Sequence, residues 1–347
     1  MTEPGSGGPM TEPVSGGLLG PRPGPTDPIR IGFQAWGQSI AWADLMATGQ
    51  RIEALGFSSL FANDHLMPIL GAADGPVVGS GGPVFEAWMT VAGWATLTRR
   101  MPLGVLVCGV GYRNVGLTVK MATALDHASG GRAIFGLGAG WHEPEHRAFG
   151  YAPLALGDRI SRLDEAARLV HGLLDGERVT LDGSWVTARD LHNDPPPVQA
   201  RMPLLIGGSG ERRTLRIVAR DADIWNGEGD PASYARKNVI LNAHCAEIGR
   251  DPSAIRRTVG VPPICIRTSR DGAVEALAAI LAQHGGTAAD ARAWAQNSPL
   301  ADTEEVVAGL LRAWRTAGAE EAIADLPWPL DDETLERLAG SMQDRLA

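Results

Sequence analysis

The stretch Leu204-Leu-Ile-Gly-Gly-Ser-Gly-Glu-Arg-Arg-Thr-Leu215 is an apolar run that breaks through three glycines into a helical pattern. Glycines carry no Cβ, so the backbone there can take a positive φ and approach a ligand closely. We expect the following helix to present unpaired N–H groups and a partial positive charge, with Arg212 and Arg213 in its first turn. This combination favours a bound phosphate. The alternative is a tight strand-to-helix turn whose arginines face solvent.

The same alternation of short apolar runs and amphipathic segments continues along the chain, which predicts a parallel α/β fold. The expected strands are residues 29–34, 58–62, 102–108, 132–138, 203–206, 222–225, 257–267 and 321–325. Eight such βα units predict a TIM (β/α)8 barrel. Residues 178–187 are expected to form a hairpin arm. The Gly-, Ala- and Pro-rich stretch 68–84 is typical of a lid or insertion.

Composition limits the possible partners and organisation of the chain. Residues 1–28 are rich in Gly, Pro and Ser, which predicts a disordered tail before a single domain over residues 29–347. The formal net charge of -9 argues against nucleic acid and anionic membranes as partners. No apolar run is long enough to cross a bilayer. Three widely spaced cysteines without CxxC spacing suggest a reduced, cytoplasmic protein.

The ends of the expected strands carry the candidate functional residues, because chemistry in a TIM barrel lies where strands end and βα loops begin. Asp64 and His65 follow the second expected strand. An imidazole there could carry a proton or hydrogen bond a cofactor, or it could be satisfied by the neighbouring loop. Trp36, Trp141 and Trp225 also fall at expected strand ends, where they could wall an apolar pocket.

Two motifs match known signatures only in part. His142-Glu-Pro-Glu-His146 has the letters of the H-E-x-x-H zinc motif, which needs both histidines on one face of a continuous helix. Pro144 disfavours the α region at Glu143, so we expect neither helical geometry across the motif nor a metal site. Gly136-Leu-Gly-Ala-Gly140 lacks the last glycine of a dinucleotide fingerprint, yet its backbone can approach a flat ligand.

A series of segments in fixed order carries a family resemblance that no single motif carries. The segments are Ile31–Gln34, Leu55–His65, Tyr112–Asn114, Leu125–Arg132, Phe135–Gly150, Ile206–Leu215 and Cys245–Pro252. Together they resemble the luciferase-like monooxygenase superfamily, in particular its coenzyme F420-dependent oxidoreductases. The resemblance covers the chain from about residue 29 to beyond residue 252.

The resemblance implies a bacterial luciferase-like TIM barrel with an insertion arm, which binds an isoalloxazine-type ring at the strand ends. His65 would be the catalytic proton carrier beside the ring. A non-proline cis peptide, here assigned to Leu106–Val107, would support one face of the ring. The expected cofactor-binding residues are Asp64, His65, Leu106, Val107, Ala139, Gly140, Gly207, Gly208, Ser209, Gly210, Glu211 and Arg212. The expected substrate pocket comprises Trp36, Gln38, Trp141, His142 and Trp225, and no metal is expected.

The activity implied is hydride transfer between F420 and a small, fairly apolar organic compound. The sugar-phosphate dehydrogenases of the family carry glutamates at the positions of Gln38 and Trp141, so the resemblance implies a different substrate here. The alternative is an FMN-dependent monooxygenase that uses reduced flavin and O2. A third hypothesis is a flavin-binding barrel without catalytic activity. A homodimer is the family expectation.

Overall fold

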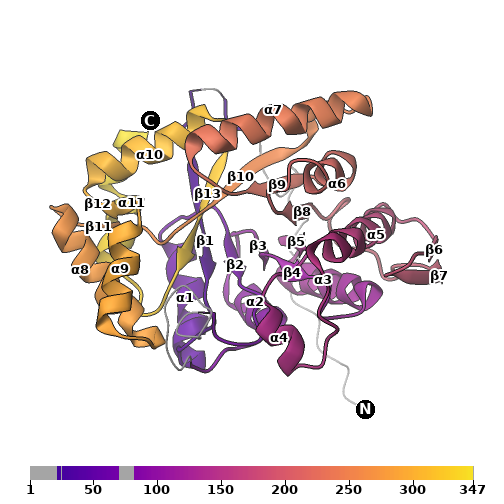
Figure 1. The fold of residues 1–347 in the computed structure, drawn as a ribbon, viewed down its shortest axis with the longest axis horizontal. Helices are drawn as coiled ribbons and strands as arrows, with labels where there is room; N and C mark the ends of the chain where they lie inside the picture. The colour runs from indigo at the N-terminus through magenta and orange to yellow at the C-terminus, as the bar shows by residue number, and fades with distance from the viewer. Residues whose placement is uncertain (1–21, 25, 70–81, 347) are drawn as a thin grey trace, which may run out of the picture.

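A ring of parallel strands closes around the centre of the molecule (Figure 1). The computed structural model describes residues 22–24, 26–69 and 82–346. The barrel strands are β1 (Arg30–Ala35), β2 (Leu60–Ala62), β3 (Leu103–Val105), β4 (Cys108–Gly109), β5 (Ala133–Gly138), β8 (Leu204–Gly207), β9 (Ile224–Gly227), β10 (Arg256–Val261) and β13 (Glu321–Leu326). Their order is β3-β2-β1-β13-β10-β9-β8-β5, pairing of β3 with β5 closes the ring, and β4 pairs with β5. The predicted TIM barrel is confirmed.

Helices surround this barrel. They are α1 (Trp42–Ala54), α2 (Ala87–Leu97), α3 (Val115–Ser129), α4 (Glu143–Ala148), α5 (Leu156–Leu174), α6 (Thr214–Asp221), α7 (Pro231–Glu247), α8 (Arg270–Leu281), α9 (Ala288–Asn297), α10 (Glu304–Thr316), α11 (Asp332–Ala339) and α12 (Ser341–Leu346). The predicted hairpin is β6 (Val179–Asp182) with β7 (Thr187–Leu191), seen at the right of Figure 1. A short pair, β11 (Cys265–Ile266) with β12 (Ala301–Asp302), lies beside α8. None of the helices described is both long and apolar enough to cross a membrane.

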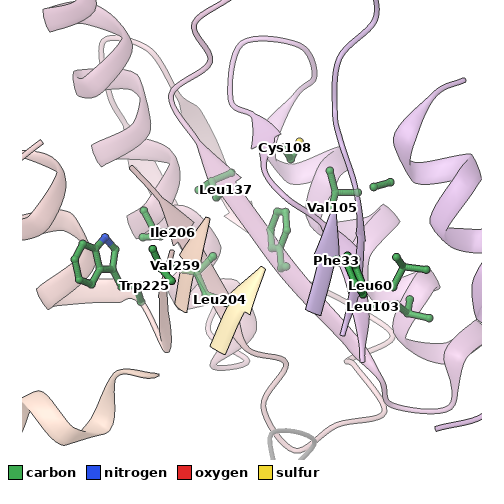
Figure 2. Close-up of a cluster of buried hydrophobic side chains, with 14 of the residues drawn as sticks. Phe33, Leu60, Leu103, Val105, Cys108, Leu137, Leu204, Ile206, Trp225 and Val259 are labelled. Carbon is green, nitrogen blue, oxygen red and sulfur yellow. The ribbon is translucent and has the colours of Figure 1, made fainter. Parts of the chain in front are cut away.

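Strand alternation divides the core into two parts, because successive side chains point to opposite faces. Outward-facing residues such as Phe33, Leu60 and Trp225 pack under the helices, as Figure 2 shows. A second, smaller cluster contains Phe61, Leu106, Ile134, Leu205, Ile224 and Ile323 and fills the barrel interior. The interior is therefore a packed core.

Two glycines allow β3 and β5 to approach each other closely. A Cβ added at Gly136 would lie 2.0 Å from the Val105 carbonyl oxygen, and one added at Gly104 would lie 2.2 Å from the Ile134 carbonyl oxygen. Both neighbours are backbone atoms, so neither can turn away as a side chain could. These positions accept glycine alone for a steric reason.

The third strand of the sequence analysis, residues 102–108, is interrupted. The peptide bond Leu106–Val107 is cis, as expected from the resemblance, and it separates β3 from β4. The Val107 side chain lies where Gly138 and Gly207 leave room for it, since an added Cβ would meet its methyl groups at 2.3 and 2.9 Å. Glycines of two other strands thus accommodate the residue that follows the cis bond.

Several predicted boundaries differ from the structure. The helix after the glycine turn begins at Thr214, so Arg212 precedes it and Arg213 is its N-cap, and neither lies in its first turn as predicted. Most of the predicted tail, residues 1–28, lies outside the described residues, although Arg315 of α10 donates hydrogen bonds to the carbonyls of Gly24 and Asp27. Residues 70–81 of the expected lid also lie outside them.

Candidate functional site

The carboxyl ends of the barrel strands open into a cavity of about 1150 Å³. Its wall brings together His65, Val107, Trp141 and the glycine turn at residues 207–210, which lie far apart in sequence. Active sites of TIM barrels lie at this end because the βα loops converge there. All twelve residues expected to bind the cofactor line the cavity.

His65 is held by a buried carboxylate. Its Nδ1 lies 3.0 and 3.1 Å from the two Glu145 oxygens, and the Glu145 side chain is 0% exposed. Glu145 also accepts hydrogen bonds from the backbone N–H groups of Leu66 and Met67 and from the Tyr112 hydroxyl. Because a carboxylate only accepts, Nδ1 of His65 carries the proton in this arrangement. The Nε2 atom has no hydrogen-bond partner among the described residues. Because His65 lines the cavity, this atom is available to a ligand there.

The surroundings of Glu145 keep it ionised. Burial raises the pKa of this carboxyl, but hydrogen bonds from His65, Tyr112 and the Met67 backbone outweigh burial, so the net pKa lies below its ordinary value. A charged group buried this deeply persists because four donors replace its water.

Glu145 belongs to the motif that resembles a zinc signature, and the structure gives the motif another role. The helix α4 begins at Glu143, so helical geometry does reach into the motif, contrary to our expectation. Pro144 is tolerated because it stands in the first turn, where its missing N–H would have no intrahelical partner. His142 lies outside the helix as its N-cap. Among the described residues, no three His, Cys, Asp or Glu side chains are grouped to hold a metal ion.

Asp64 anchors the loop that follows β4. Its carboxylate accepts two hydrogen bonds from Arg113, at 2.8 and 3.0 Å, and a third from the Gly109 backbone. Arg113 also bonds to Glu86, the N-cap of α2. Asp64 lines the cavity, but its negative charge is already paired with Arg113. It therefore holds the site in position and offers little free negative charge to a ligand.

The glycine turn leaves one arginine without a protein partner. Arg213 donates to the Gly157 carbonyl and to Ser161, both on α5, and Glu211 pairs with Arg236 at 2.9 Å. Arg212 is exposed at the cavity, and no hydrogen bond or ion pair to its guanidinium occurs among the described residues. Gly208 has φ +125°, a conformation that side chains rarely adopt. The turn therefore places the guanidinium of Arg212 beside a stretch of backbone that a ligand can approach.

Three of the residues expected in the substrate pocket do not line the cavity. Trp225 is fully buried on the outer face of β9, stacked on Tyr234, because strand alternation turns it away from the barrel mouth. Gln38 is buried and accepts a hydrogen bond from the Ile69 backbone. His142 lies behind the wall, with its ring edge-on to His65. Trp36 and Trp141 do line the cavity.

Polar side chains at three strand ends also line the cavity, in addition to the residues predicted for the cofactor site and the substrate pocket. Gln34, Asn226 and Asp325 lie at the carboxyl ends of β1, β9 and β13 and line it. Each of them stands two positions after a residue that faces into the barrel. Because residues two apart in a strand share a face, this spacing could have identified them from the sequence. Glu145 offered no comparable signal, since its contact with His65 spans 80 residues.

Comparison with known proteins places the chain in a family. The model of the luciferase-like monooxygenase family matches residues 26–339. The chain is 32% identical over 202 residues to an F420-dependent glucose-6-phosphate dehydrogenase of Beutenbergia cavernae, an alignment that covers 56% of this chain and 55% of that relative. It is 26% identical over 280 residues to a phthiodiolone/phenolphthiodiolone dimycocerosates ketoreductase of Mycobacterium bovis, covering 79% and 70%. The chain thus spans little more than half of the first of these relatives.

A solved structure extends the comparison to the whole fold. An F420-dependent secondary alcohol dehydrogenase, in complex with an F420-acetone adduct, superposes with a TM-score of 0.75 over 92% of this chain and 99% of that one. Their sequences are 16% identical, so this likeness concerns the fold. Together with the family match over nearly the entire chain, the closed barrel and the cis bond after β3 lead to one conclusion. The chain belongs to the luciferase-like monooxygenase family.

Proposed function

We propose that this protein is an F420-dependent oxidoreductase that transfers a hydride between the deazaflavin and a small alcohol or carbonyl compound. The observation that carries the proposal is the His65–Glu145 pair at the wall of a cavity that also contains the glycine turn. The relatives and the structural neighbour named for F420 support the same cofactor. FMN with O2 is the alternative cofactor chemistry.

The residues present fit a phosphorylated, flat cofactor. Arg212 is a cation without a partner among the described residues, and the glycine turn beside it lines the cavity, where its backbone could hold a phosphate. A Cβ added at Gly210 would meet the Thr214 hydroxyl at 2.8 Å, so larger residues would close this cradle. Val107 and the Ala139–Gly140 backbone line the stretch of cavity between the turn and His65. These residues would hold the ring and the phosphate.

The protein's own contribution is positioning and proton transfer. When bound, F420 supplies the hydride acceptor or donor. Glu145 fixes the tautomer of His65, so that Nε2 is available to exchange a proton with the substrate oxygen. Trp141 packs edge-on against the His65 ring, at a centroid distance of 5.3 Å, and restricts its rotation. Apolar side chains such as Leu106 and Val107 also line the cavity and would cover the bound ring.

Titration with F420 and FMN tests the cofactor assignment. We expect F420 to bind with micromolar or tighter affinity and FMN to bind more weakly, as followed by quenching of tryptophan fluorescence. Arg212→Ala should weaken F420 binding by about tenfold, because a charge-assisted contact to phosphate is lost. Arg216→Ala, an exposed arginine on α6 that pairs with Glu247, is the matched control. Binding of FMN in preference to F420 would overturn the assignment.

Glu145→Gln tests the role of the buried carboxylate. The amide of glutamine is similar in size but brings two donors toward backbone N–H groups that need an acceptor. We expect kcat to fall about tenfold or more with little change in KM. The loss should disappear when His65 is already replaced by alanine, because Glu145 acts through His65. A merely structural role would lower kcat whether or not His65 is present.

Tyr112→Phe is the comparison variant, since it removes one donor to Glu145 and leaves the carboxylate in place. Its kcat should stay within about threefold of the wild type. An equal loss of kcat in both variants would show that packing, and not the charge of Glu145, is responsible.

We also propose a cytoplasmic homodimer with a single folded domain after the N-terminal tail. Its support is the apolar surface of α2 and α3, where Met89 and Leu117 are 65% and 55% exposed and Leu97 is 40% exposed. All three cysteines are free thiols, as expected in a reducing compartment.

A further inference from the structure

Asp325 places a carboxyl group at the substrate side of the cavity. It stands at the carboxyl end of β13, two residues after Ile323, which points into the barrel interior. Strand alternation therefore directs Asp325 into the barrel mouth, and the residue lines the cavity. β13 is separated from β8, which carries the glycine turn, by two strands of the ring. The carboxyl group thus lies across the mouth from the proposed phosphate site.

No described cation neutralises the charge of Asp325. Its side chain accepts a single hydrogen bond, from Nε1 of Trp36 at 3.3 Å. Two other acids of the wall differ, because Asp64 pairs with Arg113 and Glu211 pairs with Arg236. In the described part of the chain, Asp325 takes part in no ion pair. A carboxylate without a counter-ion in a half-buried position is costly, and a cationic ligand would offset that cost.

The electrostatic surroundings reinforce this preference. Burial raises the pKa of the Asp325 carboxyl to about 7; the Trp36 hydrogen bond opposes this effect and the negative charge of Glu228 adds to it. Glu228 directly follows β9, which β10 separates from β13 in the ring, and it also lines the cavity. The arginines of the described wall are Arg212 and Arg213, both at the glycine turn. A cation bound beside Asp325 would therefore meet negative charge and no repelling neighbour.

The walls around Asp325 suit an organic cation better than a metal ion. Trp36 borders it through its indole N–H, and Trp294 of α9 lines the same cavity. Trp36 and Trp294 both pack with a cluster of buried side chains that includes Leu277 and Ala295. Indole rings attract ammonium groups and can also bury the carbon atoms next to them. A small metal ion prefers several oxygen ligands and would find few here.

We propose that Asp325, with Trp36 and Trp294 beside it, binds a protonated amine on the substrate and so determines its class as an amine-bearing alcohol or carbonyl compound. This inference rests on the proposed function, because it takes the cavity beside His65 as the substrate site. An amine-binding site here excludes sugar phosphates and other anions as substrates. They would face the negative charges of Asp325 and Glu228, with no cation among the described residues on that side.

Binding of three probes of similar shape tests the proposal, with isothermal titration calorimetry as the readout. At pH 8, F420-saturated enzyme should bind benzylammonium at least about tenfold more tightly than benzyl alcohol or benzoate. Asp325→Asn should remove this preference and leave benzyl alcohol binding within about twofold. Glu305→Gln, an exposed acid on α10, is the matched control and should bind like the wild type.

A pH series supplies a second readout. Lowering the pH from 8 to 6 should weaken benzylammonium binding by about tenfold, because Asp325 takes up a proton near pH 7 and loses its charge. Asp325→Asn should show no such dependence. Equal affinity for benzylammonium and benzyl alcohol, or an ammonium preference that survives in Asp325→Asn, would overturn the proposal. Thermal melting of each variant controls for folding.

The two proposals fail separately. F420 binding is followed by its own titration and does not involve an amine. Benzylammonium binding that occurs without F420 and is abolished by saturating F420 would place Asp325 in the cofactor site and overturn the substrate assignment. Absence of F420 binding with amine selectivity retained would reject the cofactor and leave the amine site standing.

Discussion

Replacing His65 with alanine is expected to lower F420-dependent turnover by about 10²- to 10⁴-fold, the range found for loss of a general acid–base group. Glu145 fixes Nδ1 of this imidazole, which lines the cavity. Its Nε2 has no hydrogen-bond partner among the described residues and can exchange a proton with the substrate. Steady-state kinetics followed at the F420 absorbance band measures the loss. F420 affinity should change by less than about threefold, since the proposed phosphate contacts lie at the glycine turn.

A second histidine controls for nonspecific effects of the substitution. His192→Ala, at an exposed position after β7, should retain wild-type turnover. The double variant His65→Ala with Glu145→Gln should lose little more than His65→Ala alone, because Glu145 acts through His65. Turnover of His65→Ala within about threefold of the wild type would contradict the assignment of this residue as proton carrier.

Gly136→Ala is expected to destabilise the barrel by about 3 kcal/mol or more, beyond the usual range for overpacking. The new Cβ would lie 2.0 Å from the Val105 carbonyl oxygen, so β5 and β3 would have to separate. These strands pair at Leu103–Ala133 and Gly104–Ile134, and that pairing closes the ring. Urea denaturation, compared with the wild type at constant m-value, measures the change.

Gly309→Ala is the matched control for this experiment. Gly309 lies inside α10, and a Cβ there would meet no atom within 4 Å. Alanine has the higher helix propensity, so this variant should gain about 0.5 to 1 kcal/mol. If Gly136→Ala unfolds at the same urea concentration as the wild type, β3 and β5 do not approach each other as described.

Much of the fold could be predicted because it depends on local patterns. Apolar runs of strand length, separated by amphipathic helices and ended by glycines, require a parallel sheet with crossovers, and eight of them close a barrel. The glycine turn at residues 207–210 and the pair Asp64 and His65 were located in the same way, since each directly follows a strand. The cis bond at Leu106–Val107 came from the family resemblance and is confirmed.

The errors arose where one residue of register decides the outcome. Trp225 was expected in the substrate pocket because it ends a strand, yet it points outward and Asn226 occupies the cavity wall. Successive side chains of a strand point to opposite faces of the sheet. The end of a strand in the sequence therefore shows which residues lie at the barrel rim, but not which of them point into the cavity. Arg212 was placed in a helix that begins two residues later, at Thr214.

Sequence alone determined the barrel, the rim on which the candidate residues meet and the glycines that make room there, because these depend on patterns that span one strand or one turn. Tertiary structure decided which side chains are paired. Glu145 reaches His65 across 80 residues, Trp36 meets Asp325 across 289, and Arg212 is left without a partner among the described residues. Charge pairing depends on the distances between segments far apart in sequence, and only the closed barrel sets these distances. The contact of Glu145 with His65 and the lack of an ion pair at Asp325 among the described residues could therefore be found only in the folded chain.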